Sequence, residues 1–440
     1  MIKTITKIKK NIGDFKIHFI FFIFFVFLIP FKKRIEFLND YSFFEGRFID
    51  YLTFSFYVFE FFLLVCLIFW IISIYRSRKK IEIGNKNILF PLFSLLFFSL
   101  ISFLFSTSVF ISFYYFLILI NLILVYLFVL NNLNSKQNIF IFYIFFVFTM
   151  FLQSVIVVFQ FFQNESLGLH LLGESQLSSS IAGVAKLVID GEKHIRPYGT
   201  FSHPNILAIF LCFAGVINIY LYSIIKEKFL KLFLIISFLS ISFSLFLSFS
   251  RIAWFVALPS WSFYLFNKIK TKKINLNFSK KTKNIFLLLI PLLFVLLIYF
   301  LPAIWWRLNP SLETTWESLG DRLIVFSKSW EMFCQNPWGI GFGNFIIGIS
   351  EYLIGYPYWV LEPVHNTFFI VLAEIGILGF LSFSYLFFYL FKKFKKLKTE
   401  TKVFLLMFFV FMFFDHGFWD IRQAQYLFFI FLGILSLDTK

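Results

Sequence analysis

The sequence predicts an all-α polytopic membrane protein with about twelve transmembrane helices. Hydrophobic residues make up 60% of the 440 residues, and the mean hydropathy is +0.85. A soluble domain is nearer half apolar. The apolar residues form long runs, and the basic residues cluster between the runs. Because a run of about 20 apolar residues crosses a bilayer as a helix, this pattern indicates many spans.

The apolar runs have the lengths expected of membrane helices. The first run follows several lysines but has no small-residue cleavage site, so we interpret it as a span and not as a signal peptide. Only tight turns separate the third span from the fourth and the seventh from the eighth. The predicted spans lie near 15–31, 51–75, 88–106, 109–130, 138–160, 204–225, 232–249, 252–267, 285–301, 364–391, 402–415 and 420–436.

The distribution of Lys and Arg predicts the orientation. With the N-terminus inside, 27 basic residues fall on the inner side and 12 on the outer side. Cytoplasmic loops carry the basic excess, so both termini are expected in the cytoplasm. The net charge of +17 then reflects topology, and no nucleic-acid partner is predicted.

This topology divides the chain into three parts. Residues 1–301 hold nine spans and an outer loop near 161–203, residues 302–363 form a large outer loop between the ninth and tenth helices, and residues 364–440 hold the last three spans. Within the large loop, apolar residues at helical spacing between Gly320-Asp321 and Asn336-Pro337 predict a helix lying flat on the bilayer.

Six of the ten tryptophans lie in the large loop. They are interpreted either as an interfacial aromatic belt or as a surface on which sugar rings stack. In the same loop Gly339, Gly341 and Gly343 form a turn whose amides can cradle phosphate, although loops also use glycine for turns alone.

Polar residues gather at the outer ends of the spans. Arg196 and His203 precede the sixth span, Arg251 follows a run of serines between the seventh and eighth, and Arg322 begins the surface helix. The arginine fork suits a diphosphate because it binds two oxygens at once. The alternative is an arginine that snorkels to lipid headgroups.

His365, at the start of the tenth span, is the strongest candidate base. A neutral imidazole accepts a proton from a hydroxyl at working pH, and nearby arginines keep it unprotonated. The alternative is a histidine that only caps the helix. Deeper in the same span Glu374 must be paired or protonated, and a structural partner is favoured over catalysis; Glu60 raises the same question.

No metal or cofactor is predicted. His203, His365 and the Asp415-His416 pair lack the spacing of known ligand sets, and neither an Asp-x-Asp pair nor a phosphate-binding loop is present. An enzyme that uses a nucleotide sugar in the cytosol is therefore disfavoured.

Four motifs together resemble the bacterial O-antigen ligase and O-antigen polymerase superfamily. They occur in order between Arg196 and Gly379 and read RPYGTFSHPNILAIFL, SFSR, GDRLIVFSKSWEMFCQNPWGIGFGNF and HNTFFIVLAEIGILGF. The N-terminal 195 residues carry helices but no diagnostic motif. The resemblance implies a GT-C-like glycosyltransferase in the bacterial inner membrane, with its large loop and active site in the periplasm.

The resemblance also implies the chemistry and the site. Such enzymes pass a glycan from undecaprenyl diphosphate to an acceptor hydroxyl, with inversion and without metal. His365 matches the family's histidine and would act as base, whereas Arg196 and Arg251 match arginines expected to hold the diphosphate. The expected substrate-binding set is completed by Arg322, which alternatively pins the surface helix, by Asn366, and by His203 and Asn205 of a motif whose expected role is structural.

Several functions share these motifs. The acceptor is expected to be lipid A core, and the alternatives are a polymerase that extends lipid-linked repeats and a transferase onto protein or another surface polymer. From a different class, a secondary transporter would need inverted repeats and polar residues at the midplane, and a membrane scaffold would need no outward arginines beside a histidine. Besides its donor and acceptor, the protein is expected to contact membrane lipids.

Overall fold

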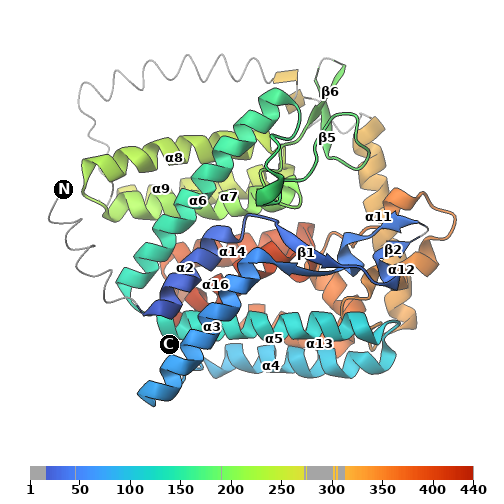
Figure 1. Ribbon diagram of the computed structural model, residues 1–440, viewed down its shortest axis with the longest axis horizontal. Coiled ribbons are helices and arrows are strands. Elements are labelled where there is room, and N and C mark those ends of the chain that lie inside the picture. Colours follow the sequence, from blue (N-terminus) through green and yellow to red (C-terminus); the bar gives the residue numbers. More distant parts are fainter. Residues whose placement is uncertain are drawn as a thin grey trace. The chain divides into compact units, whose positions relative to one another are not determined.

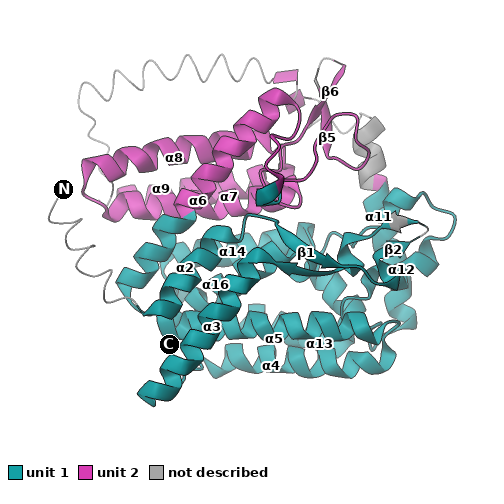
Figure 2. Cartoon of the chain, in the orientation of Figure 1, with its two compact units in different colours: residues 1–146, 171–173, 321–440 teal, residues 147–170, 174–320 magenta. Residues whose placement is uncertain are grey.

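The computed structural model describes residues 16–44, 46–189, 191–271, 274, 301–302, 304–305 and 313–439. The chain is mostly helical, with few strands (Figure 1). It divides into two compact units (Figure 2). Unit 1 comprises residues 1–146, 171–173 and 321–440, and unit 2 comprises residues 147–170 and 174–320.

The described helices support a multi-pass membrane protein. Seven of them are long and apolar enough to cross a membrane, and a shorter apolar helix, α2, covers Ile17–Leu28. Every predicted span that lies within the described residues overlaps a helix, whereas the ninth, 285–301, falls almost entirely outside them. The seven are α3 (Val58–Ser77), α4 (Lys86–Ile101, extended by a 3₁₀ turn to Phe105), α5 (Val109–Asn132), α6 (Lys136–Gln163), α7 (Pro204–Ile224), α8 (Lys228–Leu247) and α13 (Thr367–Lys392).

Unit 1 is built from packed helix pairs. The pairs are α2 with α3, α4 with α13, and α5 with α16 (Arg422–Asp438). Next to α13 lies α14 (Thr399–Phe414), and the short α15 (Gly417–Asp420) leads into α16. Aromatic rings fill much of this core: Phe408, for example, packs edge-to-face against Phe428 with ring centroids 5.2 Å apart.

The outer segment before α3 corrects the predicted second span, which was placed at 51–75. Antiparallel pairing joins β1 (Arg34–Phe37) to β4 (Phe54–Tyr57), and a second small ladder joins β2 (Phe43–Phe44) to β3 (Arg47–Phe48). The helix therefore begins only at Val58. The backbone N–H and C=O groups of residues 54–57 form hydrogen bonds across this ladder, and so they do not need the helical hydrogen bonds that the prediction assumed.

The predicted tenth span is broken. Gly376, at φ 70° and ψ −174°, interrupts α13, and only glycine adopts this conformation readily. The loop after α11 fills the break, since the amides of Ile340 and Gly341 donate to the carbonyls of Ala373 and Glu374. The amide of Ile377 donates to the Pro337 carbonyl on the other side of the break.

The surface helix is longer than predicted. It was expected to begin at Gly320-Asp321, but α11 covers Glu313–Gln335, so the glycine lies within the helix. It ends before Asn336-Pro337, as predicted. Leu323 and Trp330 are exposed, which agrees with an interfacial position.

In unit 2, α7 packs against α8 and against α9 (Arg251–Lys270). The outer loop, predicted only as a polar region, has its own small core of Leu177, Ile195 and Tyr198. A hairpin of β5 (Lys186–Ile189) and β6 (Glu192–Ile195) leads into the Arg196 motif.

Candidate active site

His365 lies at the N-terminal end of α13. The helix begins at Thr367 with Asn366 as its N-cap, whose side-chain oxygen accepts from the Phe369 amide at 2.9 Å. The Asn366 side-chain nitrogen donates to the Phe413 carbonyl at 3.2 Å. A second anchor is Thr367, whose hydroxyl donates to the Asp415 carbonyl at 2.8 Å. The capping role therefore belongs to Asn366, and His365 stands just outside the helix.

His365 is half-buried and has polar neighbours on both sides. Its Nε2 lies 3.7 Å from Oε2 of Glu362, a side chain that is largely exposed. Its ring packs against that of His416, with the centroids 5.1 Å apart. The Nδ1 atom of His365 is buried without a hydrogen-bond partner, so the ring is held by packing and by one long polar contact.

His416 forms a buried pair with Asp420. Its Nδ1 lies 2.8 Å from both carboxylate oxygens, and the side chains are only 6% and 9% exposed. Four residues separate the two across α15, which brings them onto one face. The Asp415 carboxylate, in the same turn, accepts from the Gly417 amide at 2.9 Å.

The two histidines have opposite proton affinities. Burial lowers the pKa of His365, and the positive charges of Arg322 and His416 lower it further, although Glu362 and Asp415 act against them. Burial also lowers the pKa of His416, but the Asp420 carboxylate outweighs it and raises the pKa to about 9. At neutral pH one ring is therefore a neutral base and the adjacent ring is a cation.

Unit 2 brings together the Arg196, His203 and Asn205 motif and the serine-rich turn before α9. Arg196 is 6% exposed. Its Nε donates to the Ser248 carbonyl and one terminal nitrogen donates to Oδ1 of Asn205, both at 2.8 Å. His203 is the N-cap of α7, where its Nδ1 accepts from the Asn205 amide at 3.1 Å.

Arg251 is the first residue of α9 and is half-buried. The preceding turn is sharp because Phe249 adopts a positive φ of 48°, which is uncommon for a bulky residue. The turn is tied to the other motif because Ser248, the acceptor for Arg196, lies three residues before Arg251. Two arginine motifs that are 55 positions apart in the sequence thus share one hydrogen-bonded corner of unit 2.

A family model described as O-antigen ligase matches residues 235–384. Residues 235–384 are thus similar to the O-antigen ligase family, in agreement with the resemblance to the O-antigen ligase and polymerase superfamily that the motifs indicate. Three of the four motifs lie within the matched segment. No curated protein matches the chain. The matched segment contains Arg251, Arg322 and His365, whereas Arg196 and the His416–Asp420 pair lie outside it.

The structure distributes the predicted site residues between the two units. Unit 1 holds His365, Asn366 and Arg322, and unit 2 holds the rest. Arg322 is half-buried in α11 and acts on His365 electrostatically. Of the exposed tryptophans, Trp330 contacts Phe369 through a ring pair 6.0 Å apart. Both tryptophan interpretations, the belt and the sugar-stacking surface, remain predictions.

The glycine-rich loop does not present its amides as a phosphate cradle. Those of residues 339–342 and 344 all donate to protein acceptors, for example from Phe342 to Oγ of Ser102 at 3.2 Å. Glycine is required by packing instead. A Cβ on Gly339 would meet the Glu374 carbonyl, and one on Gly343 would meet the ring of Tyr115.

The two buried glutamates in predicted spans, Glu60 and Glu374, both have structural partners. Glu374 accepts from Nε1 of Trp419 at 2.7 Å and from the Phe345 amide at 3.2 Å, as favoured from the sequence. Glu60 accepts from the hydroxyl of Tyr426 at 2.9 Å and lies 3.5 Å from Nε of Arg422. These contacts satisfy carboxylates that would be costly alone within a membrane.

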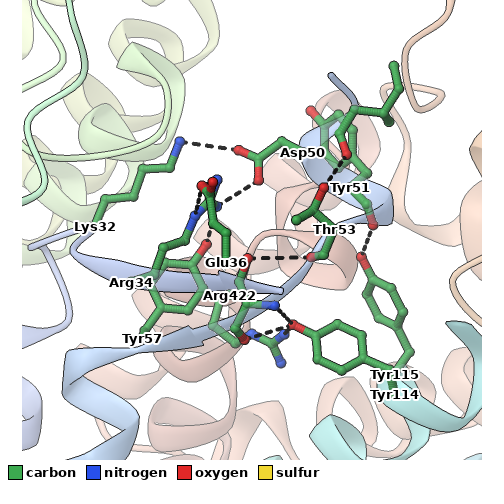
Figure 3. A network of polar contacts seen from close by, with 12 residues as sticks. Lys32, Arg34, Glu36, Asp50, Tyr51, Thr53, Tyr57, Tyr114, Tyr115 and Arg422 are labelled. Atoms are coloured by element: carbon green, nitrogen blue, oxygen red, sulfur yellow. Dashed lines mark hydrogen bonds and ion pairs between the residues drawn. The ribbon is translucent and has the colours of Figure 1, made fainter. Parts of the chain in front are cut away.

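A polar network anchors the outer segment before α3 (Figure 3). Arg34 pairs with Asp50 at 2.6 Å and with Glu36 at 2.7 Å, and Lys32 reaches the same Asp50 at 3.2 Å. On the helix side, Arg422 donates to the hydroxyl of Tyr114 at 2.9 Å. Several basic residues that were predicted to lie on the outer side, Lys32, Arg34 and Arg422, are therefore ion-paired within the protein, so their predicted location does not by itself indicate a ligand.

Sequence reasoning missed Glu362 and Asp420. The available signal for Asp420 was its position four residues after His416, a spacing that joins side chains on one helical turn. Glu362 lies three residues before His365 with Pro363 between them. The i,i+3 spacing was visible, but nothing in the sequence indicated that the chain would turn to bring the two together.

Proposed function

We propose that this chain transfers a glycan from undecaprenyl diphosphate to a hydroxyl of an acceptor, lipid A core, at the periplasmic face of the inner membrane. The family match to O-antigen ligase supports the reaction class. The observation that carries the assignment is a half-buried histidine directly before α13, a helix long and apolar enough to cross a membrane, whose pKa burial lowers.

In this proposal His365 accepts the proton of the attacking hydroxyl. The acceptor oxygen forms a bond to the anomeric carbon while the bond from that carbon to the diphosphate breaks, so the configuration inverts. The lowered pKa of His365 ensures that the base is free at neutral pH. A water-poor position strengthens its interaction with the developing charge.

The departing diphosphate requires positive charge. Arg251, half-buried at the N-terminal end of α9, is the proposed direct contact, since a helix N-terminus adds favourable dipoles for an anion. Arg196 is proposed to hold the Asn205 motif and the turn before Arg251 in place, and to add its charge to the diphosphate site. Arg322 supplies the third positive charge.

Asn366, His203 and Asn205 are proposed to shape the substrate site through the backbone. Two of the three are fixed by caps: Asn366 caps α13, and His203 caps α7. The side chain of Asn205 is held by Arg196. In unit 1 Asn366 is proposed to position His365, and in unit 2 His203 and Asn205 are proposed to position Arg251, since misplacing a reacting group by about 1 Å can cost about 100-fold in rate.

The test is transfer by purified protein in nanodiscs. The protein receives a radiolabelled undecaprenyl-diphosphate glycan and either lipid A core or a second lipid-linked repeat. Labelled lipid A core supports the ligase, whereas elongated lipid-linked glycan identifies a polymerase. No product with either acceptor, from a monodisperse protein, contradicts the proposal.

A further inference from the structure

The pair formed by His416 and Asp420 has no part in the chemistry assigned so far. Both side chains are almost fully buried, yet a buried charged pair is expensive, and an apolar pair of similar size often stabilises a fold better. The pair lies at the short α15, immediately beside His365. This position indicates a role at the His365 site.

The geometry places the imidazolium ring of the pair in contact with His365. Nδ1 of His416 donates to the Asp420 carboxylate at 2.8 Å, and the His416 ring packs against the His365 ring with the centroids 5.1 Å apart.

We propose that His416, paired with Asp420, is a positioning residue for His365: its imidazolium supports the His365 ring and keeps it in the neutral, proton-accepting form. The inference rests on the proposed function, because His365 is the base only there. His416 itself touches no substrate in this account.

Other charges face the same two rings. The carboxylates of Asp415 and Glu362 favour the cationic form of His416 together with Asp420, and the edge of the Tyr51 ring lies 5.9 Å away. Around His365, Glu362 and Asp415 favour protonation, whereas Arg322 and His416 oppose it. Loss of His416 removes one of the two opposing cations and therefore raises the pKa of His365.

The test measures the protonation of His365 without any substrate. Of the two protonation states of a histidine side chain, diethyl pyrocarbonate modifies only the neutral one, and peptide mass spectrometry quantifies the modified His365 peptide as a function of pH. In the unsubstituted protein the midpoint is expected below 6.5, the ordinary value for histidine. A midpoint above 6.5 overturns the proposal, and this measurement requires no variant.

Two substitutions of His416 distinguish the effect of its charge on His365 from the effect of its packing. His416→Asn is expected to raise the midpoint of His365 by about one pH unit or more, whereas His416→Lys, which keeps a positive charge beside Asp420, is expected to leave it nearly unchanged. His170→Asn, an exposed histidine of the outer loop, is the matched control and leaves the midpoint unchanged. Equal midpoints in the Asn and Lys variants contradict the proposal.

The shift in the His365 midpoint is also expected in the pH dependence of glycan transfer. The acid limb of kcat/KM is expected to move to higher pH in His416→Asn by the same amount and to return in His416→Lys. A merely structural His416 would lower the rate equally at every pH. If the protein transfers no glycan at all, the pH midpoints of His365 modification still show whether His416 keeps His365 neutral. Failure of the proposed function and failure of this inference are therefore distinguishable.

Discussion

Nε2 of His365 lies 3.7 Å from Oε2 of Glu362, three residues earlier in the chain. The carboxylate acts against the burial that lowers the pKa of the histidine. The positive charges of Arg322 and His416 act in the same direction as burial, so the proton affinity of His365 depends on groups of both signs.

Glu362→Gln is therefore expected to lower the pKa of His365. Because the neutral ring is the active form, the acid limb of kcat/KM should move to lower pH, by about half a unit to one unit. The measurement is the pH profile of glycan transfer. Glu351→Gln, at an exposed site of the same loop, is the control. A limb that moves to higher pH would show that Glu362 does not act through the histidine charge.

Substitution of Arg196 and substitution of Arg251 are expected to have different effects on stability and on activity. Arg196→Ala leaves the Ser248 carbonyl and Asn205 Oδ1 without their charged donor, which costs about 2–4 kcal/mol. It should lower the melting temperature and abolish transfer. Arg251→Ala should reduce kcat about 100-fold with an unchanged melting temperature. Thermal unfolding followed by size-exclusion fluorescence separates the two, and equal melting temperatures for both variants would refute the distinction.

The break in α13 can be tested at its glycine. Gly376→Ala places a Cβ against the Trp338 backbone at a φ of 70°, so it should destabilise the protein by more than the roughly 1–3 kcal/mol of a strained backbone alone. The control is Gly355→Ala, which also has a positive φ but no atom within 4 Å of the added Cβ. Similar losses of thermal stability in the two variants would mean that loop docking contributes nothing.

The buried pair of Glu60 and Arg422 should show strong coupling. Removing one partner leaves an uncompensated charge, which typically costs about 3–5 kcal/mol. Arg422→Met alone is thus expected to be poorly folded, and Glu60→Gln combined with Arg422→Met should recover much of the loss. The yield of monodisperse protein from each of the four combinations measures this. Additive losses would exclude a direct interaction.

The sequence predicted those features that depend on local pattern. Apolar run length located the helices, Asn336-Pro337 ended α11, and the HNTFF motif placed His365 at the start of α13. It also indicated that Glu374 needs a partner. These inferences succeed because hydrophobic burial and helix termini depend on residues close together in the chain.

What escaped prediction depends on contacts between distant segments. The break at Gly376 exists because the loop containing Gly339 and Gly341 donates its amides there, and no local signal marks that docking. The second span was placed too early because residues 54–57 pair with a strand 20 positions away. The Arg422 guanidinium was counted as an outward cation, although Glu60 pairs with it across 362 positions.

The central claim is that His365 is the base for glycan transfer, and one rate tests it most directly. Initial rates of transfer from the undecaprenyl-diphosphate glycan are compared for His365→Gln and His170→Gln in nanodiscs at pH 7.5. The account predicts a loss of at least about 100-fold for His365→Gln and an unchanged rate for His170→Gln. Full activity of a folded His365→Gln protein would contradict it.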